Sequence, residues 1–171
     1  MKIYKIDKIY IFLLVSLLVL SFFFGYSHTL IGGNNIKYFI IGFLMLFIMF
    51  NLINLLAKEV EITDEFISIK SLTGVRKLNF EEIEDITPLK LKGRYIFIIA
   101  DNEKYGFLSS MFDNFQEIFQ IIKEKANSEI QEKLSSITEK DFKSKKLVFV
   151  IFMLTANIFL LLASIYNLFT H

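Results

Sequence analysis

Three long apolar runs without a charged residue divide this chain, and they constrain its fold more than any other feature. The runs are Ile9–Tyr26, Tyr38–Ala57 and Leu147–Phe169, with 18, 20 and 23 residues. At a helical rise of about 1.5 Å per residue they would extend roughly 27, 30 and 34 Å, and the hydrocarbon core of a bilayer is about 30 Å thick. A segment in hydrocarbon must satisfy its own backbone hydrogen bonds, so we expect each run to be a transmembrane helix.

Between the second and third runs lies a charged block, Lys58–Lys146. It holds 15 of the 19 basic residues and 17 of the 18 acidic ones, which gives it a net charge of −2 in a chain of net charge +1. This balance does not indicate a nucleic-acid partner. The chain has no Cys, which excludes disulfides and thiolate metal sites. We therefore expect three parts: an N-terminal transmembrane hairpin (1–57), a cytoplasmic domain (58–137), and a linker with the third transmembrane helix (138–171).

The basic residues before the first run also fit a signal peptide, with Gly25-Tyr26-Ser27 as a weak cleavage site. The first run is long, however, and a second one follows soon after it, so we expect the first run to be retained as a helix. Gly32-Gly33-Asn34-Asn35 lies between the two runs and is typical of a turn. The first two runs are thus predicted to form a helical hairpin.

Basic residues that flank the runs predict which side of the membrane each part occupies. Lys37 is the only charged residue between the first two runs, and the tail after the third run is Thr170-His171. The positive-inside rule therefore predicts a multi-pass protein of the cytoplasmic (inner) membrane, with the N-terminus and the charged block in the cytoplasm and the C-terminus outside. The residues that decide this are Lys2, Lys5 and Lys8 before the first run, and Lys143, Lys145 and Lys146 before the third.

Within the charged block, polar and apolar residues alternate from Glu59 to Leu108 in about six short segments separated by turn residues. This period of two predicts an antiparallel sheet or small barrel. Beyond it the apolar spacing changes to three and four residues, which predicts one amphipathic helix from about Phe112 to Ser135. Ser110 with Asp113 fits a cap at its start, and Thr138 with Asp141 fits a second cap, opening a helix that continues into the third run.

A strand meander followed by one amphipathic helix resembles a pleckstrin-homology (PH) fold, and in particular the PH-like domains of small bacterial membrane proteins. The resemblance implies an α+β cytoplasmic domain in which a PH-like sheet or barrel is closed by the helix. The chain departs from the pattern in having six predicted strands where the fold has seven, and in its third apolar run. The matching positions are Ile62-Thr63, Ile67, Ile69, Gly74, Leu78-Asn79-Phe80, Ile83, Ile86, Phe97–Ile99, Asn102 and Phe115–Ile122.

A basic cluster offers the best candidate contact with a membrane surface or a partner. It comprises Lys90, Lys92 and Arg94, with Arg76 and Lys77. Lys or Arg near an anionic surface contributes about 1 kcal/mol each. The alternative is a solvated hairpin edge whose charges discourage strand-to-strand aggregation. In PH domains that bind phosphoinositides the first hairpin turn is basic, whereas here that turn is the acidic Thr63-Asp64-Glu65. The resemblance therefore brings no headgroup site with it.

Asn51, Asn54 and Asn157 are amides that lie within the apolar runs. Amides in hydrocarbon need partners, and we expect interhelical hydrogen bonds. A polar transport path is the alternative, but such paths usually include an ionisable residue, and the runs contain none. The acidic run Glu81–Asp85 is read as a solvated face, and His28 stands alone in sequence, so no catalytic residue, metal site or cofactor is predicted.

These patterns favour an interaction module held at the inner leaflet, binding a protein partner or the membrane surface, and not an enzyme. The lipid bilayer is an expected partner, and a protein partner or a second copy of the chain is a further one; no nucleic acid is expected. One alternative is a membrane-embedded immunity or protective factor, in which the helices bind. Another is a membrane-bound enzyme acting on lipids, which the lack of an acid–base pair near the membrane disfavours.

Overall fold

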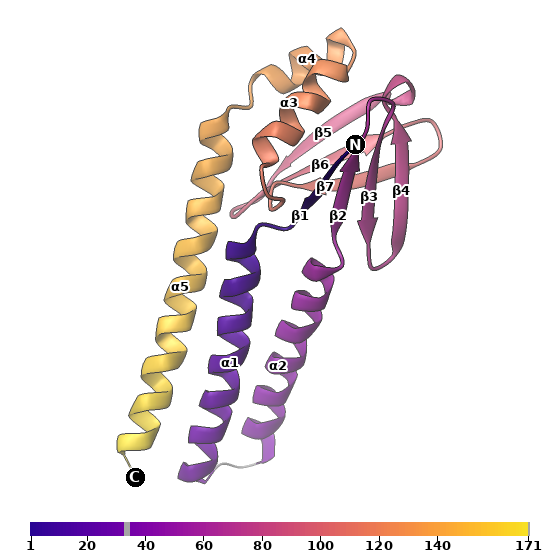
Figure 1. Cartoon of the computed structure of the whole chain (residues 1–171). Helices are drawn as coiled ribbons and strands as arrows, with labels where there is room; N and C mark the ends of the chain where they lie inside the picture. The colour runs from indigo at the N-terminus through magenta and orange to yellow at the C-terminus, as the bar shows by residue number, and fades with distance from the viewer. Residues whose placement is uncertain (33–34, 171) are drawn as a thin grey trace. The chain divides into compact units, whose positions relative to one another are not determined.

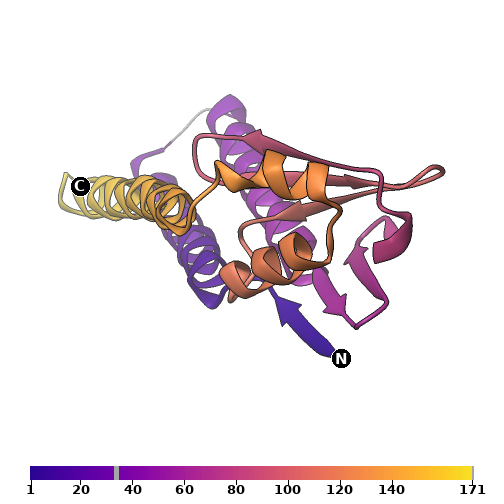
Figure 2. The same ribbon diagram turned by 90° about the horizontal axis from the view of Figure 1, so that it is seen from above.

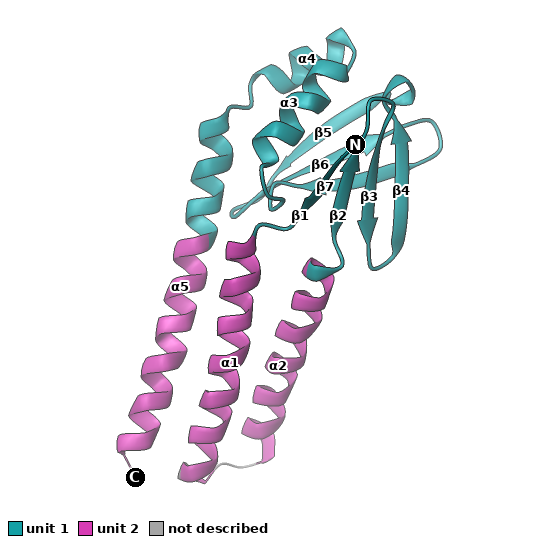
Figure 3. Ribbon diagram, in the orientation of Figure 1, with its two compact units in different colours: residues 1–7, 56–149 teal, residues 8–55, 150–171 magenta. Residues whose placement is uncertain are grey.

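The computed structural model describes residues 1–32 and 35–170, which fall into two compact units (Figure 1, Figure 3). Unit 1 comprises residues 1–7 and 56–149, and unit 2 comprises residues 8–55 and 150–171. Gly33 and Asn34 of the predicted turn, and the terminal His171, lie outside the described residues.

Unit 2 consists of apolar helices. They are α1 (Lys8–Ile31), α2 (Asn35–Leu56) and the part of α5 (Glu139–Phe169) that follows Phe149. All three helices are long and apolar enough to cross a membrane. The prediction of three apolar helices is therefore confirmed, and these helices indicate a membrane-associated protein.

Unit 1 contains seven strands in two antiparallel sheets. Four of them form one sheet in the order β1-β2-β3-β4, and three form the other in the order β5-β6-β7. A short 3-10 helix, η1 (Phe80–Glu82), connects the two. The strands are β1 (Lys2–Lys5), β2 (Glu59–Ile62), β3 (Phe66–Ser71), β4 (Gly74–Asn79), β5 (Asp85–Lys90), β6 (Tyr95–Ala100) and β7 (Tyr105–Ser109).

Strand β1 is not among the six strands expected from the sequence. It precedes α1 and pairs with β2, which follows α2, so that Lys2 lies opposite Ile62 and Lys5 opposite Glu59. Tyr4 is buried while its neighbour Ile3 is exposed, as the alternating faces of a strand require. The α1–α2 hairpin is therefore inserted between the first and second strands of one sheet.

The two sheets do not form a closed barrel, although they pack on each other where Gly106 of β7 approaches Ile69 of β3 and Leu78 of β4. Ile6 and Phe112 form an isolated bridge between them. Beside it the Asp7 N–H donates to the Met111 carbonyl at 2.9 Å, and the Asp113 N–H donates to the Lys5 carbonyl at 2.8 Å. Within residues 1–32 and 35–170 no ladder of strand hydrogen bonds joins β4 to β5.

The prediction of a single amphipathic helix over residues 112–135 is wrong in two respects. It is divided into α3 (Phe115–Lys125) and α4 (Ser128–Ser135), because Ala126 is extended and the Asn127 side chain accepts a hydrogen bond from the Ile130 N–H at 2.9 Å, which starts a new helix. The predicted cap at Ser110 is also wrong, since its hydroxyl accepts from the Tyr95 N–H instead. Both helices overlie the strands in Figure 2.

An aromatic cluster forms the centre of unit 1. Phe97 of β6 packs against Phe115 and Phe119 of α3, with ring centroids 5.6 and 5.4 Å apart. Phe142 of α5 lies 5.0 Å from Phe115 and 5.1 Å from Phe119, and 5.5 Å from Tyr95. Phe119 of α3 therefore packs on Phe97, on the inner face of β6. Rings at these separations and tilts attract one another in addition to burying apolar area.

The start of α5 agrees with the predicted cap. The Asp141 carboxylate accepts hydrogen bonds from both the N–H and the hydroxyl of Thr138, at 2.9 and 2.8 Å. Both hydrogen bonds lower the pKa of Asp141, and the bond from the Thr138 N–H has the larger effect. From Glu139 the helix continues without a break to Phe169, through the third apolar run.

Candidate functional site

The five residues of the predicted basic cluster do not form one group. Arg76 and Lys77 lie on β4, whereas Lys90, Lys92 and Arg94 lie at the end of β5 and in the turn before β6. Figures 1 and 2 show β4 and the β5–β6 turn at opposite sides of unit 1. The Lys77 ammonium stands over the Phe66 ring, 3.6 Å from its centroid, which is a local contact within the sheet.

The β5–β6 turn lies where the chain passes from unit 1 into the apolar helices. A Cβ placed on Gly93 would stand 3.2 Å from a ring carbon of Phe149, the last residue of α5 in unit 1. Lys58 lies two residues after the end of α2. Its pKa is lowered mainly by burial and to a smaller extent by the positive charge of Arg94. Both links place this turn at the connections to α2 and α5.

The connection to α1 lies at the same end of unit 1. Asp7, the last residue before α1, forms an ion pair with Lys146, which lies one helical turn before Phe149 in α5. We call this end of unit 1 the basal end; it comprises Asp7, Lys58, Lys90–Arg94 and Lys146–Phe149. All three connections to the apolar helices therefore leave unit 1 from the basal end.

Inside the β5–β6 turn, backbone and side-chain contacts fix the chain. The Leu91 N–H donates to the Arg94 carbonyl at 2.9 Å, which closes the turn. The Arg94 guanidinium donates to the sulfur of Met111 at 3.2 Å, and the Lys90 ammonium lies 5.9 Å from the centroid of the Tyr95 ring. Lys92 is exposed and has no ion-pair or hydrogen-bond partner among the described residues.

A second candidate surface, which the sequence analysis does not identify, is the outward face of the β5–β7 sheet. We call it the outer β5–β7 face. Strand pairing sets Ile96 opposite Leu89 and Ile98 opposite Phe107, and Tyr105 lies two residues before Phe107 on the same face of β7. Leu89, Tyr105 and Phe107 are 42%, 60% and 56% exposed, and the two Ile side chains are half-buried. The outward face of an antiparallel sheet is usually polar. The outer β5–β7 face is apolar instead, as a sheet face covered by another molecule or element would be.

A signal for this surface was present in the sequence. Residues 95–100 are apolar at every position, which is typical of a strand that is covered on both faces. In unit 1 only one of its faces, with Tyr95, Phe97 and Ile99, lies in the core.

The three predicted helix amides have different surroundings within unit 2. Asn157 is buried, and its side-chain amide donates to the Met153 carbonyl at 2.8 Å and to the Leu13 carbonyl of α1 at 3.4 Å. The Asn51 amide donates to Phe47 in its own helix at 2.8 Å. The Asn54 side chain has no hydrogen-bond partner in the described part of the chain.

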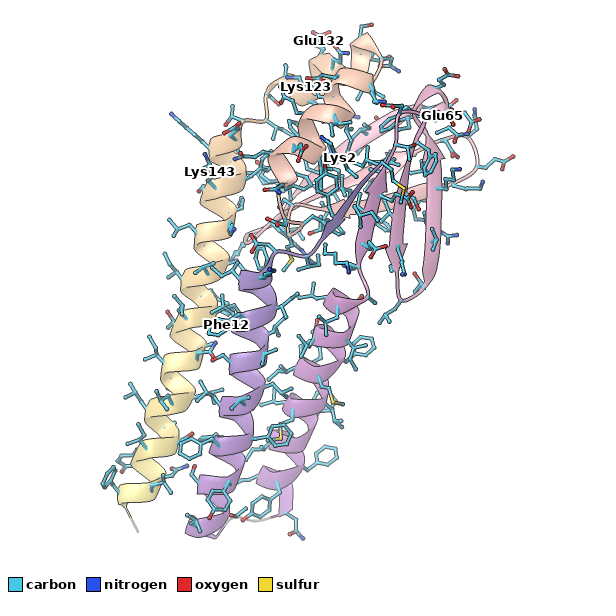
Figure 4. All side chains as sticks on the ribbon, in the orientation of Figure 1. Lys2, Phe12, Glu65, Lys123, Glu132 and Lys143 are labelled. Carbon is cyan, nitrogen blue, oxygen red and sulfur yellow. The ribbon has the colours of Figure 1, made fainter. Side chains whose placement is uncertain are left out.

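A cavity of about 360 Å³ lies in unit 1 between Asp7, the segment that leads into the start of α3, and the start of α5. Its charged residues are largely paired: Asp7 with Lys146, and Glu117 with Lys2 at 2.6 Å. Figure 4 labels Lys2 on β1 and Lys143, which lines the cavity, on α5.

Outside this cavity, the Asp85 carboxylate pairs with Lys133 at 2.6 Å, and this hydrogen bond lowers the pKa of Asp85. Among the residues described, no group of three His, Cys, Asp or Glu side chains could hold a metal.

Comparison of the chain with protein-family models, with curated proteins and with solved structures gives no significant match.

Proposed function

We propose that this chain is an integral membrane protein whose apolar helices hold a PH-like interaction module at the cytoplasmic face of the membrane. Seven strands in two antiparallel sheets, followed by helices that cover them, support the PH-like assignment. The seventh strand, absent from the sequence prediction, is β1. The proposal assigns the module no catalytic residue and no cofactor.

The observation that carries the proposal is the apolar outer β5–β7 face. Soluble proteins rarely leave contiguous apolar side chains exposed unless they meet another molecule there. Phe107 and Tyr105 contact each other with ring centroids 5.4 Å apart and remain more than half exposed. Aromatic side chains are enriched in protein interfaces, so we assign this face to a protein partner that presents an apolar surface of its own.

Photo-crosslinking tests this assignment. A photoreactive amino acid at Phe107 should form an adduct with a protein in intact membranes, and the same group at Glu132, on the exposed side of α4, should not. Replacing Ile98 with Ser, opposite Phe107 in the sheet, should reduce the adduct at least severalfold while the domain keeps its protease resistance. An adduct with a second copy of the chain would identify the partner as the protein itself. Yields at 107 no higher than at 132, or adducts with lipid alone, would overturn the assignment.

The sidedness of the proposal has its own test. Flanking Lys residues predict a cytoplasmic domain, and β1–β2 pairing requires that the start of α1 and the end of α2 lie on the same side of any membrane that they cross. A reporter inserted at Asn102, in the exposed β6–β7 turn, should be cytoplasmic, and a reporter after the last residue should be outside. A cytoplasmic C-terminal reporter would show that one of the three helices does not span.

A further inference from the structure

The basal end of unit 1 must face the lipid headgroups if the three apolar helices span a membrane, because all three connections leave unit 1 there. Gly93 locates the β5–β6 turn within this end, since it lies against Phe149. Phe149 is the third residue of the uncharged run that begins at Leu147, so it lies about 3 Å along the helix axis inside that run. The turn is thus placed at the level where α5 becomes apolar.

The exposed side chains of this turn suit an interface between water and lipid. Leu91 is 42% exposed, and it stands between the charged side chains of Lys90 and Lys92. Arg94 completes the turn, and its charge acts on Lys58 nearby. Positive charge is therefore concentrated at the end of unit 1 from which the helices leave. Apolar side chains flanked by cations favour contact with an anionic leaflet.

A second turn lies at the same end of the four-stranded sheet. Glu59, the first residue of β2, is opposite Lys70 of β3, which is in turn opposite Val75 of β4. Leu72 and Thr73 form the loop beyond that row, on the side from which the chain leaves toward α2. Leu72 is 49% exposed and Val75 58%. This loop adds apolar side chains to the basal end without adding negative charge.

We infer that the basal end docks onto the surface of an anionic lipid bilayer, with Lys90, Lys92 and Arg94 contacting lipid phosphates and Leu72 and Leu91 entering the interfacial layer. The inference rests on the membrane anchoring in the proposed function and is independent of the protein partner. It also differs from a headgroup site in the first hairpin turn, because the acidic Thr63–Glu65 turn lies at the opposite end of β2 from the basal end.

Single-cysteine labelling can measure this contact, because the chain contains no Cys. Position 93 is unsuitable for a probe, since any side chain there would press on Phe149. We would place a fluorophore on Thr73→Cys, which leaves the basic residues intact, and a second one on Asn102→Cys, in the turn at the other end of β6. The full chain is reconstituted in vesicles with lipid-attached quenchers, made either of phosphatidylcholine alone or with added phosphatidylglycerol.

Two double variants separate a local effect from a change in net charge. Lys90→Gln with Lys92→Gln removes two charges from the basal end and keeps Arg94 with its contact to Met111. Lys104→Gln with Lys123→Gln removes two charges from the β6–β7 turn and α3. Each charge removed from the basal end should lower the ratio of docked to undocked domain about fivefold in anionic vesicles. Protease resistance of each variant shows that the domain is folded.

We expect stronger quenching of the fluorophore at position 73 than at position 102. Quenching at position 73 should increase when anionic lipid is added. That increase should be lost in the Lys90/Lys92 variant and kept in the Lys104/Lys123 variant. A higher salt concentration should also reduce the increase in quenching at position 73, because salt screens the attraction between the basic side chains and the anionic lipid. Quenching at 73 that is the same in both vesicles and in both variants would overturn the inference. The crosslink at 107 reports separately on the proposed function, because neither double variant changes the outer β5–β7 face.

Discussion

Replacing Phe97 with Ala is expected to destabilise unit 1 by about 3–5 kcal/mol, the usual cost of deleting a buried aromatic ring. Phe97 is 2% exposed, and its ring contacts those of Phe115, Phe119 and Phe142. A small domain has only about 5–15 kcal/mol of stability, so this one change removes a large share of it. Phe119→Ala should have an effect of similar size, because it removes a second ring from the same cluster.

Urea-dependent proteolysis of the membrane-bound protein measures the loss. The matched control is Ile96→Ala, one residue away on the same strand but on the outward face, where the side chain is half-buried and its truncation should cost clearly less. Equal effects of the two substitutions would mean that the inner and outer faces of β6 have been assigned the wrong way round.

Replacing Tyr4 with Ala should destabilise unit 1 by about 3 kcal/mol, although Tyr4 lies outside the charged block. Its side chain is 6% exposed on the inner face of β1, and burial raises the pKa of its hydroxyl. The control is Ile3→Ala on the opposite face, where a side chain 52% exposed should contribute within about 0.5 kcal/mol.

Protease resistance of residues 58–149 in membranes is the measurement for this pair. An unchanged domain in Tyr4→Ala would show that β1 is dispensable and that the residues before α1 serve only as positive charges for topology. A loss in Tyr4→Ala but not in Ile3→Ala would establish β1 as part of the fold.

The sequence predicted the elements whose stability is local. The apolar runs and the cap formed by Thr138 and Asp141 depend on neighbouring residues, and they are found where expected. The period-two strands between Glu59 and Leu108 also appear, because each of them pairs with at least one strand that is its neighbour along the chain.

Elements that depend on distant partners escaped prediction. Four residues of β1 carry too little pattern to indicate a strand, and their partner lies beyond the whole α1–α2 hairpin. The break between α3 and α4 was missed for a different reason: its cap is local, with Asn127 accepting from the Ile130 N–H, but the apolar spacing continues across the break. The basic cluster was divided for the first of these reasons: sequence proximity cannot show that Arg76 and Arg94 lie on different sheets.

The insertion of the α1–α2 hairpin within one sheet has a consequence for the order in which the protein is made. Strand β1 leaves the ribosome before the hairpin, and its partner β2 begins at Glu59, 54 residues after Lys5. At 5–20 residues per second, β1 waits roughly 3–11 s without a partner. If the hairpin spans a membrane, both strands must stay on the same side while it inserts, so the sheet cannot be completed until the chain has returned to that side. Assembly of unit 1 would then be a late step that depends on correct membrane insertion.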